Sequence, residues 1–230
     1  MTTEAPPTPF SVALRKATWA RHEGIDATKK TEPEPEGPSI LGALLDGELH
    51  LDDYTALHSQ QYFVYRLLDE ATEHWRDHPV AGRFCYPELS RAQAFDADLS
   101  LLIGPNWREE IAPIASTRTY LNRLQEICFD WPGGFIAHHY TRYLGDLSGG
   151  QAFRAAINNT YGFNDGPGVS FYVFDEIPKP AEFKDGYRAQ LDAAGFDGDE
   201  RDRVIAEVLD AYDYNSNVLG ELTGMMRRSV

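Results

Sequence analysis

HHYTRYLGDLSGGQAFRAAI, residues 138–157, has strongly helical flanks but carries Gly145, Gly149 and Gly150 in its interior. Three interior glycines cost roughly 2–3 kcal/mol relative to alanine, so an ordinary helix would not keep them without a reason. Gly145 and Gly149 are one turn apart on the same face, where the missing side chains would let a flat ligand lie against the helix or let the helix bend. Tight packing against another helix explains the same spacing equally well.

Apolar residues recur at helical spacing over most of the chain outside this stretch. From Ile40 onward this periodicity is sustained and period-2 alternation is almost absent, which predicts an all-α fold. Only Val169 to Phe174 has a strand-like composition, and it has no obvious partner. Turn signals such as IGPN, DWPGG and GFNDGPG separate the helices. We expect one helix to begin near Phe10 and others at roughly 52–77, 88–103, 106–112, 116–128, 134–161, 179–194 and 198–226.

The length of 230 residues fits a single domain, which we place at 10–226. The proline-rich and polar start of the chain predicts a flexible tail at 1–9. The run TKKTEPEPEGP alternates proline with acidic residues, which cannot form the interior of a helix. We therefore expect an exposed acidic, proline-rich loop at 28–38.

Composition and charge exclude several classes of function. The formal net charge of -15 argues against binding to nucleic acid or to an anionic membrane, since both need a basic face. Cys85 and Cys128 have no CxxC spacing, which indicates neither a disulfide framework nor a zinc site and favours a reducing cytoplasm. The chain lacks a signal-like start and any run of 18 apolar residues, so we expect a cytoplasmic protein without a membrane span.

The segment YTRYLGDLSGGQ, residues 140–151, resembles the signature of the heme (haem) oxygenases. The similarity extends in the family's order over residues 11–222, through LRKATWARHEGID, QQYFVYRLLDEA, FKDGYRAQL and AYDYNSNVLGEL. It implies a single all-α domain that holds heme between a proximal helix and a distal helix kinked at Gly145 and Gly149, which contact the porphyrin. The implied reaction cleaves heme with O2 and electrons to biliverdin, ferrous iron and carbon monoxide. The implied protein is a monomer that receives electrons from a reductase or a ferredoxin-type donor.

His22 matches the family's iron ligand. Arg15 lies two helical turns before it, roughly 10 Å away on nearly the same face, which is about the span from a heme iron to a propionate. Asp26 lies one turn beyond His22 and could accept a hydrogen bond from the second imidazole nitrogen. The family commonly carries Glu at the Asp26 position. Without the resemblance, His22 would be interpreted as a surface histidine of a helix.

Lys184 and Arg188 are four residues apart, which places two like charges on one helical face. This arrangement is mildly destabilising unless an anion joins the two cations. A solvated face is the alternative. The resemblance implies that both bind heme propionates and that Tyr140 adds a hydroxyl contact. It also places Arg142 and Ser148 among the residues that contact heme.

The resemblance gives Asp146 a catalytic part, because the matching aspartate anchors water molecules near the reacting oxygen. Tyr65 and Asn215 match the partners of that aspartate. By spacing alone, Asp146 and Arg142 form an ordinary helical ion pair, worth a few tenths of a kcal/mol. Asn215 lies on the apolar stripe of the last helix, where a polar side chain is expected to have a buried partner.

Three other functions compete with an oxygenase. A protein that carries heme without degrading it could use the same iron ligand, but it would not need a polar group such as Asp146. A di-iron carboxylate bundle would need paired Glu-x-x-His motifs, which are absent from the sequence. A helical scaffold would not explain the three glycines. His138 and His139 diverge by about 100° on a helix, so they do not predict a shared metal site.

Overall fold

The computed structural model describes residues 8–28 and 38–226, with the backbone alone for 20–28. All regular elements in these ranges are helices, which confirms the all-α prediction. The α-helices are α1 (Phe10–Thr28), α2 (Ile40–Leu45), α3 (Leu51–Trp75), α4 (Ala92–Leu102), α5 (Trp107–Glu110), α6 (Ala115–Ile127), α7 (Pro132–Asp146), α8 (Gly150–Tyr161), α9 (Pro180–Asp192) and α10 (Gly198–Met225). Three short 3₁₀ helices are η1 (Ala81–Phe84), η2 (Pro87–Leu89) and η3 (Ser170–Tyr172). The expected tail at 1–9 and loop at 28–38 fall almost entirely outside these described residues.

The prediction of one long helix at 134–161 is wrong, because the chain forms two helices, α7 and α8, with a break at 147–149. At the break the carbonyl of Gly145 accepts hydrogen bonds from the amides of Ser148 and Gly149, at 3.1 and 2.8 Å. The strand-like segment at 169–174 instead contains η3. The helix expected at 88–103 is divided into η2 and α4, and α2 and η1 were not among the expected helices.

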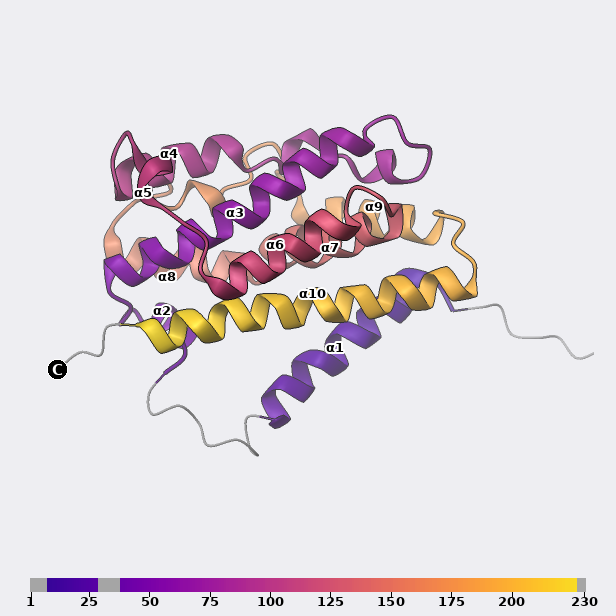
Figure 1. The fold of residues 1–230 in the computed structure, drawn as a ribbon, viewed down its shortest axis with the longest axis horizontal. Coiled ribbons are helices and arrows are strands. Elements are labelled where there is room, and N and C mark those ends of the chain that lie inside the picture. The colour runs from indigo at the N-terminus through magenta and orange to yellow at the C-terminus, as the bar shows by residue number, and fades with distance from the viewer. Residues whose placement is uncertain (1–7, 29–37, 227–230) are drawn as a thin grey trace, which may run out of the picture.

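Helix α7 lies at the centre of the molecule, and every residue from 133 to 144 is buried. Helix α10 runs the length of the protein and packs against α7, α6 and α1, as Figure 1 shows. Helix α3 covers another side, where it contacts α4, α6 and α7. The C-terminal end of α7 is therefore surrounded by side chains from several helices. In the part of the chain that the structure describes, no helix is long and apolar enough to cross a membrane.

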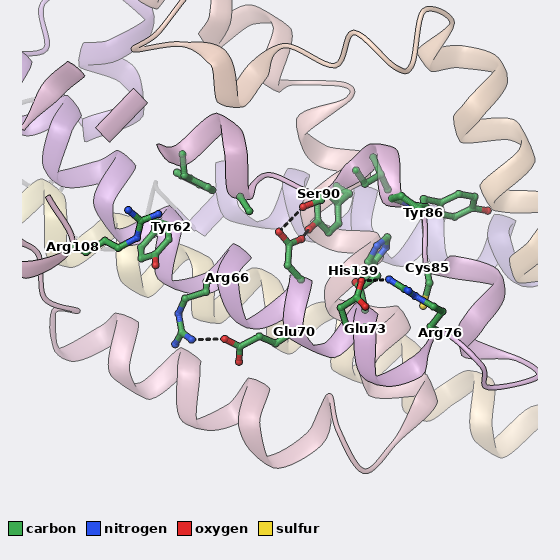
Figure 2. A pocket seen from close by; sticks show the side chains of 17 residues that line it. Tyr62, Arg66, Glu70, Glu73, Arg76, Cys85, Tyr86, Ser90, Arg108 and His139 are labelled. Atoms are coloured by element: carbon green, nitrogen blue, oxygen red, sulfur yellow. Dashed lines mark hydrogen bonds and ion pairs between the residues drawn. The ribbon is translucent and has the colours of Figure 1, made fainter. Parts of the chain in front are cut away.

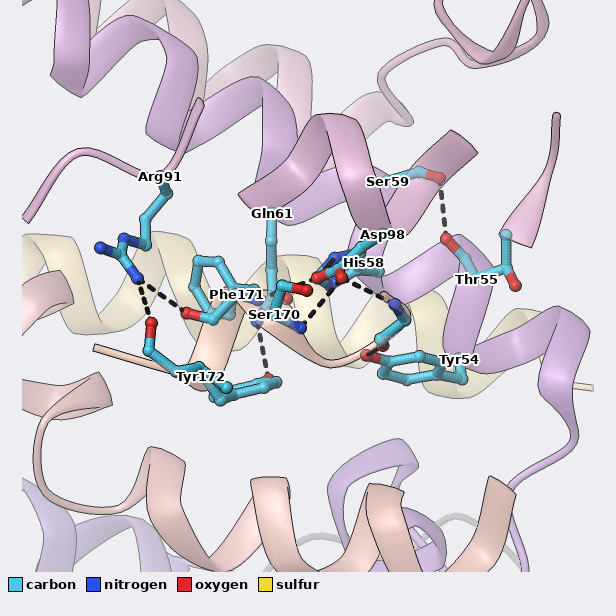
Figure 3. A network of polar contacts seen from close by, with 12 residues as sticks. Tyr54, Thr55, His58, Ser59, Gln61, Arg91, Asp98, Ser170, Phe171 and Tyr172 are labelled. Atoms are coloured by element: carbon cyan, nitrogen blue, oxygen red, sulfur yellow. Dashed lines mark hydrogen bonds and ion pairs between the residues drawn. The ribbon is translucent and has the colours of Figure 1, made fainter. Parts of the chain in front are cut away.

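A buried carboxylate fixes the segment around η3 against the rest of the protein (Figure 3). Asp98 on α4 is 0% exposed and accepts hydrogen bonds from the amides of Gly168, Ser170 and Phe171, at 2.7, 2.9 and 2.9 Å. The ring of His58 on α3 bonds the same carboxylate at 3.1 Å. Hydrogen bonds to the charged form hold the pKa of Asp98 below its usual range despite burial. This anchor gives η3 a fixed position beside α3.

Candidate active site

The break between α7 and α8 exposes a strip of backbone. Gly145, Ser148 and Gly149 are exposed, although Leu144, Leu147 and Gly150 beside them are buried. A Cβ atom added at Gly145 would meet nothing described within 4 Å, and one at Gly149 would meet only the Gly145 carbonyl at 3.8 Å. Gly150 differs, because its Cβ would lie 3.2 Å from the ring of Tyr172. Helix packing therefore explains Gly150, whereas Gly145 and Gly149 leave an open face on which a flat ligand fits.

A polar cluster lies directly beside this face. Tyr65 on α3 is fully buried, and its hydroxyl donates a hydrogen bond to the carboxylate of Asp146. Arg142, one turn before Asp146, lies over the Tyr65 ring at 5.0 Å and donates to the side-chain carbonyl of Asn215 on α10. The expected buried partner of Asn215 is thus Arg142. Among the described contacts, Arg142 forms this bond in place of the expected ion pair with Asp146.

The electrostatics of the cluster keep Asp146 close to its titration point at neutral pH. Burial raises the pKa of Asp146 to about 6, and the charges of Arg142 and Arg91 and the hydrogen bond from Tyr65 oppose the rise. Burial also raises the pKa of Tyr65 well above its usual range, so this phenol remains a donor. Asp146 can therefore bind and release a proton near neutral pH, while Tyr65 remains protonated.

A second group of polar side chains gathers where α1, α7 and α9 meet. Tyr140 of α7 is buried, which raises the pKa of its hydroxyl. The positive charges of Arg188 and Arg15 and a hydrogen bond with Thr18 oppose this rise, so these side chains lie near the phenol. The structure thus brings together Arg15, Tyr140 and Arg188, three of the residues that the sequence predicts around an anionic ligand.

Lys184 connects α9 to the break between α7 and α8. Its ammonium donates to the hydroxyl of Ser148 at 2.9 Å and to the carbonyl of Leu147 at 3.4 Å. Burial and the nearby charge of Arg188 lower the pKa of Lys184. Arg188 itself pairs with Asp185 at 2.8 Å. Two repelling cations therefore lie at the edge of the open face, where an anionic group would relieve their repulsion.

The predicted iron ligand His22 and its neighbour Asp26 belong to α1, but their side chains lie outside the described part of the structure. The helix that carries them also carries Arg15, which approaches Tyr140. Within the described ranges, no group of three or more His, Cys, Asp or Glu side chains gathers as a metal site. The position of His22 as ligand remains a prediction.

The two histidines that directly precede the signature segment, His138 and His139, are part of the core. The ring nitrogens of His138 bond the hydroxyl of Tyr120 at 3.1 Å and the carboxylate of Glu207 at 3.0 Å. Nδ1 of His139 bonds the hydroxyl of Tyr187 at 3.0 Å. Burial lowers the pKa of both rings, to about 3 for His139, so the ring of His139 is neutral at pH 7.

Three further residues, which no sequence motif marked, support the cluster around Asp146. Arg91 is buried and donates to the carbonyls of Phe171 and Val173, and its charge acts on Asp146. Tyr143 packs edge-on against Tyr65 at 5.2 Å, and its hydroxyl donates to Asp69 at 2.7 Å. In the sequence, the one feature that could have indicated Asp69 is its position one helical turn after Tyr65, because this spacing places both residues on the same face of α3.

These features define an all-helical protein with a flat ligand site at a helix break, bordered by cations and by a half-buried carboxylate. The model of the family "Heme oxygenase" matches residues 8–221. "Heme oxygenase 1" of Synechocystis is 33% identical over 205 residues, which cover 89% of this chain and 85% of the relative. The chain belongs to the heme oxygenase family.

Solved structures of related proteins agree in fold. The crystal structure of heme oxygenase-1 from Synechocystis in complex with heme superposes with a TM-score of 0.83 at 31% identity and covers 95% of this chain and 94% of that one. The heme oxygenase of Leptospira interrogans superposes with a TM-score of 0.82 at 28% identity, over 93% and 100% of the two chains. The prediction of a heme oxygenase fold is therefore confirmed.

Proposed function

We propose that this heme oxygenase binds heme on the open face at Gly145 and Gly149 and cleaves it there to biliverdin, ferrous iron and carbon monoxide. The observation that carries this proposal is the bond between Tyr65 and Asp146 beside an exposed backbone face. A face without side chains admits a flat ring at close range. A half-buried carboxylate with a pKa of about 6 next to that face can take part in proton transfer.

The charged edge of heme has partners on two helices. Lys184 and Arg188 of α9 lie at one side of the open face, and Arg15 of α1 contributes a third cation near Tyr140. Each charge-assisted hydrogen bond to a propionate would contribute roughly 1.5–3 kcal/mol. His22 of α1 would bind the iron through a neutral imidazole, and Asp26 would orient that ring.

Bound heme supplies the iron that activates oxygen and the ring that is oxidised. The protein contributes position and protons. Asp146 would hold water molecules over the open face and supply protons there, and Tyr65 fixes the carboxylate by its hydrogen bond. Arg142, held by Asn215, keeps a positive charge beside the carboxylate. Gly145, Ser148 and Gly149 bring polar backbone close to the ring without filling the space that the ring needs.

The remaining parts of the proposal concern the cellular setting. The reaction consumes electrons, for which we propose a reductase or a ferredoxin-type protein as donor. We further propose that the protein acts as a monomer in the cytoplasm. Size-exclusion chromatography with light scattering would test the oligomeric state.

The proposal is tested by replacing the predicted ligand. His22→Ala should change the absorption spectrum of added heme and stop biliverdin formation, and exogenous imidazole should restore part of both. His74→Ala, at an exposed position on α3, is the control and should match the wild type. An unchanged heme spectrum in His22→Ala would overturn the assignment of the ligand.

A further inference from the structure

A cavity of about 370 Å³ lies between α3, α4 and the segment that carries η1 and η2 (Figure 2). Its volume is within the usual range for sites that bind small molecules. None of the residues assigned above to heme lines it. The lining residues are Tyr62, Arg66, Asp69, Glu70, Thr72, Glu73, Arg76, Cys85, Tyr86, Pro87, Leu89, Ser90, Ala92, Phe95, Arg108, His139 and Tyr143.

The walls of the cavity are rich in aromatic rings. Tyr62 of α3 and Phe95 of α4 are in contact, with ring centroids 5.8 Å apart. Tyr143 of α7 and Tyr86, between η1 and η2, line the cavity as well. Aromatic rings attract other flat rings by stacking and edge-to-face contacts worth about 0.5–1.5 kcal/mol per pair beyond the area buried. The cavity therefore favours a planar aromatic molecule.

His139 gives the cavity a buried hydrogen-bonding group. Its side chain is 1% exposed, and its Nδ1 bonds Tyr187, which does not line the cavity. The Tyr187 hydroxyl has no other partner among the described residues; donating its proton to Nδ1 would satisfy it and would place the ring hydrogen on Nε2. Nε2 lies on the other side of the ring and has no described hydrogen-bond partner. A ligand with an acceptor would satisfy this donor.

The charges around the cavity disfavour an ion at its inner end. The Asp69 carboxylate already accepts hydrogen bonds from Tyr143, from the hydroxyl of Ser90 and from the amide of Arg91, at 2.7, 3.0 and 3.3 Å. The negative charge of Asp69 would repel an anion. Both oxygens of this carboxylate already accept hydrogen bonds, which makes it a poor partner for a cation. His139 is neutral, because burial lowers its pKa to about 3. At the rim, the opposite charges within each of the ion pairs Arg66–Glu70 and Arg76–Glu73 offset each other.

We propose that this cavity is a binding site for an uncharged planar aromatic molecule of one or two rings that carries a hydrogen-bond acceptor. The aromatic walls hold the ring, and Nε2 of His139 donates to the acceptor. The site is distinct from that proposed for heme. Its ligand would contact Tyr143, whose ring packs against Tyr65.

The first test compares two probes on two forms of the heme-loaded enzyme by isothermal titration calorimetry. 1-Indanone carries a carbonyl acceptor, whereas indane has the same ring frame without it. On the wild type, 1-indanone should bind roughly three- to tenfold more tightly than indane, which is the usual range for one hydrogen bond. On His139→Phe the two probes should bind equally. Equal binding of both probes to the wild type would overturn the role of His139.

The second test closes the cavity and does not depend on the folding of the His139 variant. Ala92 is exposed at the start of α4 and lines the cavity, while its neighbour Gln93 is exposed and does not. Ala92→Trp should abolish binding of 1-indanone, and the matched control Gln93→Trp should leave it unchanged. The heme absorption spectrum should be the same with and without the probe. Binding that survives in Ala92→Trp, or a probe that alters the heme spectrum, would overturn the proposal.

Discussion

Replacing Tyr65 by phenylalanine removes one hydroxyl from the cluster, and with it the hydrogen bond to Asp146. The ring of Tyr65 packs against Phe171 and Tyr143, at 4.9 and 5.2 Å, and these contacts do not involve its hydroxyl. Tyr65→Phe should therefore fold normally and lose the bond from its hydroxyl to Asp146, together with the hydrogen bond between that hydroxyl and Arg142. A hydrogen bond to a charged group is worth roughly 1.5–3 kcal/mol, and one pKa unit corresponds to about 1.4 kcal/mol.

The loss should appear in the titration of Asp146. Its pKa is about 6 with the bond in place, because the bond stabilises the charged form and partly offsets the effect of burial. In Tyr65→Phe the pKa should rise by roughly one to two units. The titration can be followed in the heme-free protein by NMR of the ¹³C-labelled aspartate carboxyl carbons, with Asp146→Asn to assign the resonance.

Tyr62→Phe provides the matched control, because Tyr62 lies one turn earlier on α3 and forms no described bond with Asp146. This variant should leave the pKa of Asp146 unchanged. A pKa that stays within about 0.3 units of the wild type in Tyr65→Phe would refute the argument that Tyr65 stabilises the charged carboxylate.

Two other predictions concern the same helix break. Gly145→Ala should keep or slightly raise the thermal stability of the heme-free protein but weaken heme binding at least tenfold. Gly150→Ala should instead lower the stability by about 1–3 kcal/mol, because its Cβ atom would press on the ring of Tyr172. Equal effects of the two variants on heme affinity would contradict this contrast. Asp146 holds its proton more tightly in the folded state, with a pKa of about 6 against about 4 when unfolded. The heme-free wild type should therefore lose stability relative to Asp146→Asn as the pH rises from about 4 to about 6, and thermal unfolding of both proteins measures this loss. A difference in stability that stays constant over this pH range would contradict the raised pKa of Asp146.

The sequence predicted most of the helices, because apolar residues at helical spacing report directly which face is buried. It also predicted that Asn215 has a buried partner, although only the structure identifies that partner as Arg142. The resemblance to the heme oxygenases indicated Tyr65 and Asp146 as partners, and the structure places their side chains in contact.

The break between α7 and α8 could not be predicted from the glycines alone. Glycine permits a continuous bent helix as well as two separate helices, and the choice depends on contacts from distant segments. Here the ring of Tyr172 occupies the space beside Gly150, and Tyr172 belongs to the η3 segment that Asp98 holds from α4. The cavity beside His139 likewise depends on how α3, α4 and α7 pack, which no local pattern reports.

The most direct test of the account separates heme binding from heme cleavage at Asp146. Asp146→Ala leaves His22 and the cations of α1 and α9 in place, so heme affinity should fall by less than about tenfold, or 1.4 kcal/mol. Biliverdin formation with oxygen and a reductant should fall by roughly 10²–10⁴-fold, the usual contribution of a positioned proton-transfer group. Asp77→Ala, in an exposed turn, should match the wild type in both measurements. Biliverdin formation by Asp146→Ala at the wild-type rate would contradict the account.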